Sequence, residues 1–152
     1  MAKLKVGSLN CQGQSKMSLA KQLFVQHVLK LYNFDILCTQ ETFIEDDAFE
    51  SCDFVSKNYN LVKNNSQNNF GTAIFVRNTF EIGDVKFDTE GRIIILNIGE
   101  FTLGNVYAKA GTDGDSRKLR ENMFCEILPN MLRLRKNKII ICGDWNSITE
   151  KN

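Results

Sequence analysis

The region from Phe54 to Ala108 consists of short apolar segments that are joined by connections of only a few residues. Five segments in this region and three outside it are expected to be strands: 4–12, 35–41, 54–63, 71–78, 80–86, 92–98, 101–108 and 138–143. Parallel neighbours in a sheet need a crossover of about a dozen residues or more, and most of these connections are too short for one. The sheet structure must therefore be partly antiparallel.

Two longer segments show the apolar spacing of amphipathic helices. The first follows a capping residue, Ser18, ends near Asn33 and carries Leu19, Leu23, Phe24, Val28, Leu31 and Tyr32. The second is expected to begin at Ser116, and Pro129 inside it predicts a bend near Leu128. The acidic stretch 41–53 is expected to form a short helix, with an acidic ion-binding patch as the alternative.

The composition places few demands on this architecture. The chain has 152 residues, 43% hydrophobic and 24% charged, and is expected to be one domain over 1–152. A formal net charge of +1 gives no global attraction to nucleic acid or membranes, so any nucleic-acid contact requires a local patch. The sequence contains neither an apolar span of about 20 residues nor a signal-peptide core, which predicts an intracellular protein.

The cysteine pattern agrees with a reducing compartment. The five cysteines form no CxxC pair, and their odd number does not suggest a disulfide framework. The only histidine, His27, lies within the first expected helix and is interpreted as a structural residue. Zinc-ligand spacing is absent, which argues against a zinc site.

Polar residues occupy the tips of four expected strands. "LKVGSLNCQGQ" ends its strand at Asn10, "DILCTQET" at Glu41, "LGNVYAKAG" at Tyr107, and "IIICGDWNS" at Asp144 and Asn146. Each of these residues also has a purely structural explanation. Asn10 could cap a turn, Glu41 could be an acid at the start of a helix, and Tyr107 could be a packing aromatic at a strand end. Asp144 and Asn146 could form a turn held by side-chain-to-backbone hydrogen bonds. On an extended chain the last two would point to one side, with Trp145 facing away into packing.

These four pieces, in this order, resemble the endonuclease/exonuclease/phosphatase superfamily, which includes deoxyribonuclease I and the apurinic endonucleases. The sequences of the four pieces are most similar to those of the endonuclease domains of non-LTR retrotransposons, with a "GTAI"-like strand and an "EGR"-like segment between the pieces. The resemblance implies a mixed α/β sandwich of two sheets, of the deoxyribonuclease I-like type. Members of the family continue with a C-terminal segment that closes in Ser-Asp-His, which this sequence lacks. The chain is therefore expected to be a C-terminally incomplete domain.

The resemblance also implies a magnesium-dependent phosphodiester hydrolysis, with Mn²⁺ as a substitute. Mg²⁺ takes oxygen ligands, usually one or two carboxylates with waters, and stabilises charge on phosphoryl oxygens. By resemblance Glu41 is the direct metal ligand, with Asn10 beside it. Asp144 would orient or deprotonate the attacking water, Asn146 would hydrogen-bond a phosphate oxygen, and Tyr107 would add a phenolic hydrogen bond.

Two departures from the family pattern bear on the substrate. Gln12 stands where apurinic endonucleases carry an aspartate, which argues against abasic-site repair. Lys109 replaces the usual proline after "NVYA", and it is a candidate for contact with a DNA backbone, as are the loop residues Asn68 and Asn69.

The second helix and its exit could form a basic stripe for phosphates or simply a solvated face. The basic residues concerned are Arg117, Lys118, Arg120, Arg133, Arg135, Lys136 and Lys138.

The leading hypothesis is a DNA-nicking endonuclease domain of a non-LTR retrotransposon, acting in the nucleus and impaired in this chain. One alternative is a phosphoesterase of the same superfamily that acts on a small or lipid phosphate. The other is a non-catalytic fragment that binds DNA or assembles with a partner.

Overall fold

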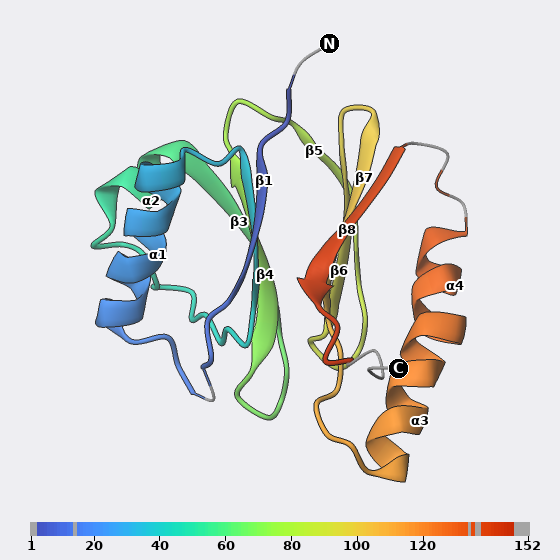
Figure 1. The fold of residues 1–152 in the computed structure, drawn as a ribbon. Coiled ribbons are helices and arrows are strands. Elements are labelled where there is room, and N and C mark those ends of the chain that lie inside the picture. Colours follow the sequence, from blue (N-terminus) through green and yellow to red (C-terminus); the bar gives the residue numbers. More distant parts are fainter. Residues whose placement is uncertain (1–2, 14, 134, 136–137, 148–152) are drawn as a thin grey trace.

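A computed structural model of the chain describes residues 3–13, 15–133, 135 and 138–147 (Figure 1). Two four-stranded sheets pack face to face, with helices on the outer face of each. The first sheet has the order β1-β2-β4-β3, with bounds Val6–Asn10, Ile36–Gln40, Gly71–Arg77 and Tyr59–Asn65. The second has the order β5-β6-β7-β8, with bounds Ile82–Phe87, Ile93–Ile98, Phe101–Tyr107 and Lys138–Asp144. The predicted two-sheet mixed α/β fold is confirmed.

The two sheets share one strand pattern. In each, one edge pair is parallel, β1 with β2 and β7 with β8, and the remaining pairs are antiparallel. Helix α1, Leu19–Tyr32, makes the crossover from β1 to β2. The helical stretch between β7 and β8 makes the second crossover, as parallel pairing requires. The predicted mixture of parallel and antiparallel strands is therefore confirmed.

Helix α1 begins and ends where the sequence predicts, but it packs by a different face. Ser18 caps its start, and Asn33 ends it in a left-handed conformation. Val25 and Leu29 are fully buried, whereas Leu19, Leu23, Phe24, Leu31 and Tyr32 are about half exposed. Gln22 and Gln26 face the 45–54 segment, where their side-chain carbonyls accept the backbone N–H groups of Phe49 and Phe54, respectively.

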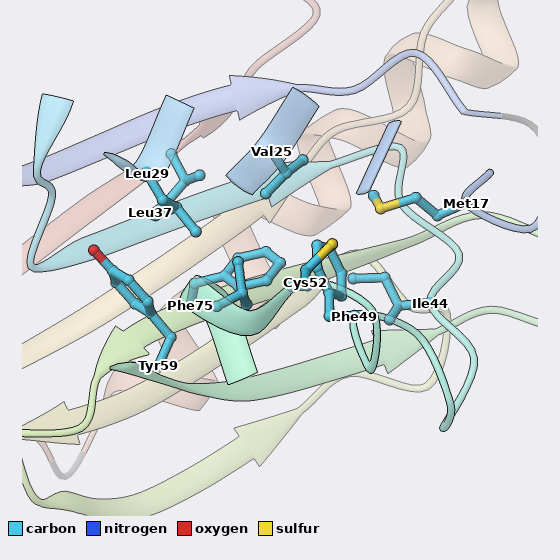
Figure 2. Packing of buried hydrophobic residues seen from close by; sticks show 11 residues of the cluster. Met17, Val25, Leu29, Leu37, Ile44, Phe49, Cys52, Tyr59 and Phe75 are labelled. Carbon is cyan, nitrogen blue, oxygen red and sulfur yellow. The ribbon is translucent and has the colours of Figure 1, made fainter. Parts of the chain in front are cut away.

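The outer core of the first sheet is shown in Figure 2. Val25 and Leu29 of α1 meet Leu37 and Phe75 of the sheet, and Phe49 packs edge-on against Phe75 at 5.2 Å between ring centroids. Burying such a side chain contributes about 1.5–3 kcal/mol. A second cluster lies between the sheets, and a third beneath the second sheet's helices.

Among the described residues, no helix is long and apolar enough to cross a membrane.

The helix predicted over the acidic stretch 41–53 is wrong. The chain there runs as an extended piece and turns, and a short helix α2 follows at Asp53–Asn58, where the sequence predicted a strand. Side chains from elsewhere take the backbone N–H groups that a helix would use, as Asn65 does for Ile44. The acids pair with lysines instead: Glu45 with Lys16, and Asp46 with Lys63. These pairs favour neither the helix nor the ion-binding patch.

The second crossover helix is interrupted, as Pro129 predicted. Helix α3, Gly114–Asn122, passes into a π-helical segment, Met123–Ile127, and then into α4, Leu128–Leu132. Pro129 lies in the first turn of α4, directly after the π-helical segment. The expected cap at Ser116 is wrong, because Asp113 caps α3 and accepts the Ser116 backbone N–H.

Candidate active site

The site lies where the parallel edge pair of one sheet meets that of the other. Asn10 is paired with Gln40 at the end of β1 and β2, and Tyr107 with Asp144 at the end of β7 and β8. The carboxyl ends of both pairs lie at the lower end of the sandwich in Figure 1. This shared end, which we call the junction, brings four polar strand tips together.

Asn10 joins the two carboxylates of the junction. Its side-chain nitrogen donates to Glu41 Oε1 at 3.1 Å and to Asp144 Oδ2 at 2.7 Å. Its side-chain oxygen accepts the backbone N–H of Gln12 at 2.8 Å. One neutral amide therefore holds a carboxylate from each sheet, although 134 residues separate Asn10 from Asp144.

Glu41 is held by its backbone in a conformation that residues other than glycine rarely adopt. Its φ is +53°, and its carbonyl accepts the Gly13 backbone N–H at 2.9 Å. A Cβ at position 13 would lie 2.7 Å from that carbonyl oxygen, so only glycine fits there without a shift. Lys21 of α1 also donates to the carbonyls of Cys11 and Gln12. The exit of β1 therefore fixes Glu41.

Tyr107 faces Glu41 from the opposite sheet. Burial, the charge of Glu41 and a hydrogen bond to Glu41 together raise the pKa of Tyr107 to about 12. The phenol is therefore protonated at neutral pH, and its hydroxyl acts as a donor toward the carboxylate.

Arg92 positions Tyr107 through contacts with its ring and its backbone carbonyl. Its guanidinium carbon lies 5.0 Å from the Tyr107 ring centroid and 4.7 Å from that of Phe70, and it donates to the Tyr107 carbonyl at 3.2 Å. The two rings meet edge to face at 5.8 Å. Asp88 in turn accepts the Arg92 backbone N–H, which fixes the turn that carries this arginine.

Asn146 lies beside Asp144, but not through an extended chain. Strand β8 ends at Asp144, and Asn146 has a left-handed φ of +45°. Its backbone N–H donates to Asp144 Oδ1 at 3.1 Å, and its side-chain nitrogen donates to the Ala108 carbonyl at 2.8 Å. The extended-chain geometry predicted for this pair is therefore wrong, and a turn replaces it. Trp145 contacts Phe124 at 5.3 Å between ring centroids, but it is 38% exposed and lines the same cavity as Asp144 and Asn146, so it only partly faces away into packing.

The donor set fits a hard divalent cation at Glu41. Two carboxylate oxygens, one from Glu41 and one from Asp144, lie within hydrogen-bond distance of the same nitrogen. Mg²⁺ is bound in proteins by one or two carboxylates and several waters. Among the described residues no group of three or more histidine, cysteine, aspartate or glutamate side chains could hold a metal. Asn10 presents its nitrogen to the carboxylates, so its oxygen is not aimed at a shared ligand position.

Two cavities open at the junction. The Glu41 cavity, of about 430 Å³, is lined by Gly13, Glu41, Asn68, Phe70, Arg92, Tyr107, Lys109 and Ala110. Asn68 and Lys109 therefore lie beside the candidate metal ligand, whereas Asn69 is exposed and not part of this lining. The second cavity, of about 890 Å³, lies on the other side of Asn10 and Asp144.

The basic residues considered as a possible stripe for phosphates lie in different places and make different contacts. Arg117 and Arg120 line the second cavity, and Arg120 donates to the carbonyls of Lys109 and Gly111. Arg135 is buried near Asp84, and Lys138 pairs with Glu100. Lys136 lies outside the described residues. These contacts favour a structural role for Arg135 and leave Arg117 and Arg120 nearest to the site.

Sequence reasoning missed the polar pair beneath the site. Gln40 and Asn105 are almost fully buried, and Gln40 donates to Asn105 across the sheets at 2.8 Å. Asn105 donates to the carbonyls of Thr39 and Ala73, at 2.9 Å each. Both residues stand inside recognised pieces, "QET" and "NVYA", and Arg92 stands in the "EGR" segment. A polar residue within an otherwise apolar strand was the signal that could have identified them.

A model of the Endonuclease/Exonuclease/phosphatase family matches residues 7–150. The chain belongs to this family, and the superfamily predicted from sequence is confirmed. It is 32% identical over 155 residues to a DNA-(apurinic or apyrimidinic site) endonuclease of Dictyostelium discoideum, covering 94% of this chain and 42% of the relative. It is 31% identical over 153 residues to an exodeoxyribonuclease of Bacillus subtilis (strain 168), covering 94% and 58%. The chain thus spans about half the length of these curated relatives.

Solved structures agree with this assignment. An AP endonuclease from Archaeoglobus fulgidus superposes with a TM-score of 0.71 at 29% identity, covering 95% of this chain and 58% of that one. A 3′ phosphatase from Neisseria bound to a product DNA hairpin superposes with a TM-score of 0.74, covering 95% and 58%. Its 22% identity supports the fold alone. The two curated relatives are an AP endonuclease and an exonuclease, so they do not support the narrower likeness to retrotransposon enzymes.

Proposed function

We propose that this chain carries the metal-binding part of a DNA phosphodiesterase site, with Mg²⁺ or Mn²⁺ bound at Glu41. The observation that supports this most directly is the Asn10 amide, which holds Glu41 and Asp144 together at the junction. A carboxylate-bound cation at this position would stabilise charge on a phosphoryl oxygen. The named DNA-directed activities of the two curated relatives support the choice of substrate.

The other residues then have distinct roles. Asp144 would orient and accept a proton from the attacking water, because its carboxylate lies beside that of Glu41 across Asn10. Tyr107 would donate a hydrogen bond from its hydroxyl near the phosphate, since its raised pKa keeps the phenol protonated. Asn146 would bind a phosphate oxygen only by exchanging its present bond to Ala108. Lys109 and Asn68, in the Glu41 cavity, would contact the DNA backbone, and exposed Asn69 would contact it outside the cavity.

An imidazole does not take part in this proposed site. The sole histidine of the sequence, His27, is exposed on α1, on the outer face of the first sheet. A general acid–base group typically contributes about 10²–10⁴-fold to rate. We therefore expect slow turnover from residues 1–152, which we propose form a single domain.

The narrower hypothesis is a strand-nicking domain of a non-LTR retrotransposon, which would act in the nucleus. It rests on the sequences of the four strand-tip pieces and on Gln12, which stands where apurinic endonucleases carry an aspartate. The comparison of supercoiled DNA, an abasic duplex and a phosphoinositide as substrates separates this hypothesis from abasic-site cleavage and from lipid phosphate hydrolysis.

The test replaces Glu41 with glutamine, which keeps the shape of the side chain and removes its charge. We expect Mg²⁺ affinity, measured by isothermal titration calorimetry, to fall at least tenfold, and the slow nicking of supercoiled plasmid to disappear. Glu81→Gln, an exposed acid outside the junction, serves as the matched control and should change neither. Equal Mg²⁺ affinity in Glu41→Gln and wild-type protein would contradict the proposal.

A further inference from the structure

A third cavity, which we call the side cavity, adjoins the Glu41 cavity and has no role in the chemistry described above. It has a volume of about 600 Å³ and lies between the loop 66–70, the turn 88–92 and the α3–π-helical stretch. Small-molecule sites in proteins typically measure about 300–1,000 Å³. The side cavity is therefore large enough for one nucleoside.

The two cavities share one wall. Asn68, Phe70, Arg92 and Lys109 line both of them. This wall contains two cations, one amide and one aromatic ring, which are the groups that bind phosphate oxygens and bases. A ligand that spans the wall would have a phosphate beside Glu41 and its next group in the side cavity.

The second crossover helix supplies the apolar part of the lining, together with one polar residue, Asn122. Leu119 of α3 is 50% exposed, and Met123 and Ile127 of the π-helical segment line the cavity beside it. The lining also includes two acids, Asp88 and Glu90. These carboxylates disfavour a second phosphate inside the cavity, whereas an uncharged base and sugar meet no such repulsion.

We infer that the side cavity binds the unstacked base of a nucleotide that adjoins the reacting phosphate. The base lies against Phe70 and the apolar floor, while Arg92 and Lys109 face the intervening phosphate. This inference rests on the proposed function, and it specifies the substrate as a nucleic-acid strand with an unpaired base at that position. A small or lipid phosphate would leave the side cavity empty.

Arg92 is well placed for this role because its orientation is fixed from several sides. Asp88 accepts its backbone N–H, Glu90 lies 3.6 Å from its Nε, and two rings flank its guanidinium. Its side chain is 9% exposed, and this small exposed part lies in the wall of both cavities. A guanidinium held in this way loses little freedom when it binds a phosphate.

The test compares two fluorescein-labelled probes of equal length and charge by fluorescence anisotropy. One is hexathymidylate, and the other is the same backbone with abasic residues in place of the bases. We expect wild-type protein to bind hexathymidylate roughly tenfold more tightly than the abasic probe, as base stacking on an aromatic ring predicts. Phe70→Leu should reduce this ratio to near one, because it retains an apolar side chain and removes the ring.

Controls separate the cavity from general effects on folding or charge. Phe24→Leu, on the half-exposed face of α1, should leave the ratio unchanged. Leu119→Asp places a carboxylate on the cavity floor and should lower the ratio, whereas Leu23→Asp, at a similarly exposed position on α1, should not. The ratio cancels the charge effect because both probes carry the same charge.

Equal wild-type affinity for the two probes, or no binding of either, would overturn the inference. A ratio that survives both Phe70→Leu and Leu119→Asp would overturn it as well. Mg²⁺ affinity of the Glu41→Gln variant is measured independently of these probes. Loss of the base preference with normal Mg²⁺ binding at Glu41 would therefore leave the proposed function standing.

Discussion

The tip of β1 and β2 and the tip of β7 and β8 are built from the same strand arrangement but are held by different means. Each is the parallel edge pair of its sheet, and each delivers one carboxylate to the junction. At the first tip, backbone bonds such as Gly13 to Glu41 fix the acid. At the second, a backbone bond from the Ala108 N–H to the Asp144 carbonyl also fixes the acid, at 2.9 Å. This tip has two further contacts: the Asn146 side chain bonds the Ala108 carbonyl, and Gly143 packs directly on the Val106 backbone.

This difference indicates where each tip is sensitive to mutation. Hydrogen bonds between main-chain atoms survive most side-chain changes, so the first tip should depend mainly on Gly13 and on the Lys21 side chain, which bonds the carbonyls of Cys11 and Gln12. The second tip depends in addition on the Asn146 side chain and on Gly143. Beneath both tips, Gln40 and Asn105 join the sheets, so loss of this link should affect the two tips equally.

The largest expected effect comes from Asn105→Leu. This change removes the donor to Thr39 and Ala73 and the acceptor for Gln40, in a fully buried position. Each buried polar group left without a partner costs about 1–3 kcal/mol, so we expect a loss of about 3 kcal/mol or more in urea unfolding. Asn60→Leu, exposed on β3, should change the free energy of unfolding by about 0.5 kcal/mol or less. A loss below about 1 kcal/mol at position 105 would show that apolar packing alone joins the sheets.

A pair of glycine substitutions compares the tips directly. Gly143→Ala would place a Cβ against the Val106 backbone at a φ of +154°, and we expect a loss of about 3 kcal/mol. Gly13→Ala meets one carbonyl oxygen, and we expect about 1–2 kcal/mol. Gly114→Ala, with open space around it, should be neutral or slightly stabilising. Equal losses at positions 13 and 143, measured by urea unfolding, would contradict the distinction between the tips.

The smallest expected effect is spectroscopic. Burial and Glu41 raise the pKa of Tyr107 from its ordinary 10.0 to about 12, so the folded state favours the protonated phenol. Its contribution to stability is therefore fully present below pH 10 and is lost as the pH rises from about 10 toward 12. The difference in absorbance at 295 nm between wild-type protein and Tyr107→Phe should titrate near pH 12. A difference that titrates near pH 10 would place the Tyr107 hydroxyl outside the influence of Glu41.

The strands and the site were predictable from the sequence to different degrees. Alternating and apolar segments located all eight strands to within a few residues, although the third begins five residues later than expected. The acidic stretch misled because the preference for acids in the first turn of a helix is local, whereas Gln22 and Asn65, distant in sequence, accept its backbone N–H groups. Tertiary hydrogen bonds of this kind override local propensity.

The residues at the strand tips were predictable because a strand end fixes where its polar residue emerges. The way in which they meet was not. The left-handed turn at Asn146 and the Asn10 amide between two acids depend on how the sheets are placed relative to each other. Spacing along a single strand contains no information about the opposite sheet, and for that reason the Arg92 and Phe70 wall was also missed.

The Asn10 amide bears on how the protein would take up the proposed metal ion. Two like charges so close together would normally repel and spread apart until a cation arrived. The amide hydrogens of Asn10 donate to both carboxylates, so the fold itself holds the two acids in register. Folding and ion uptake should accordingly be separable events, with the ion adding stability only by mass action at its own concentration.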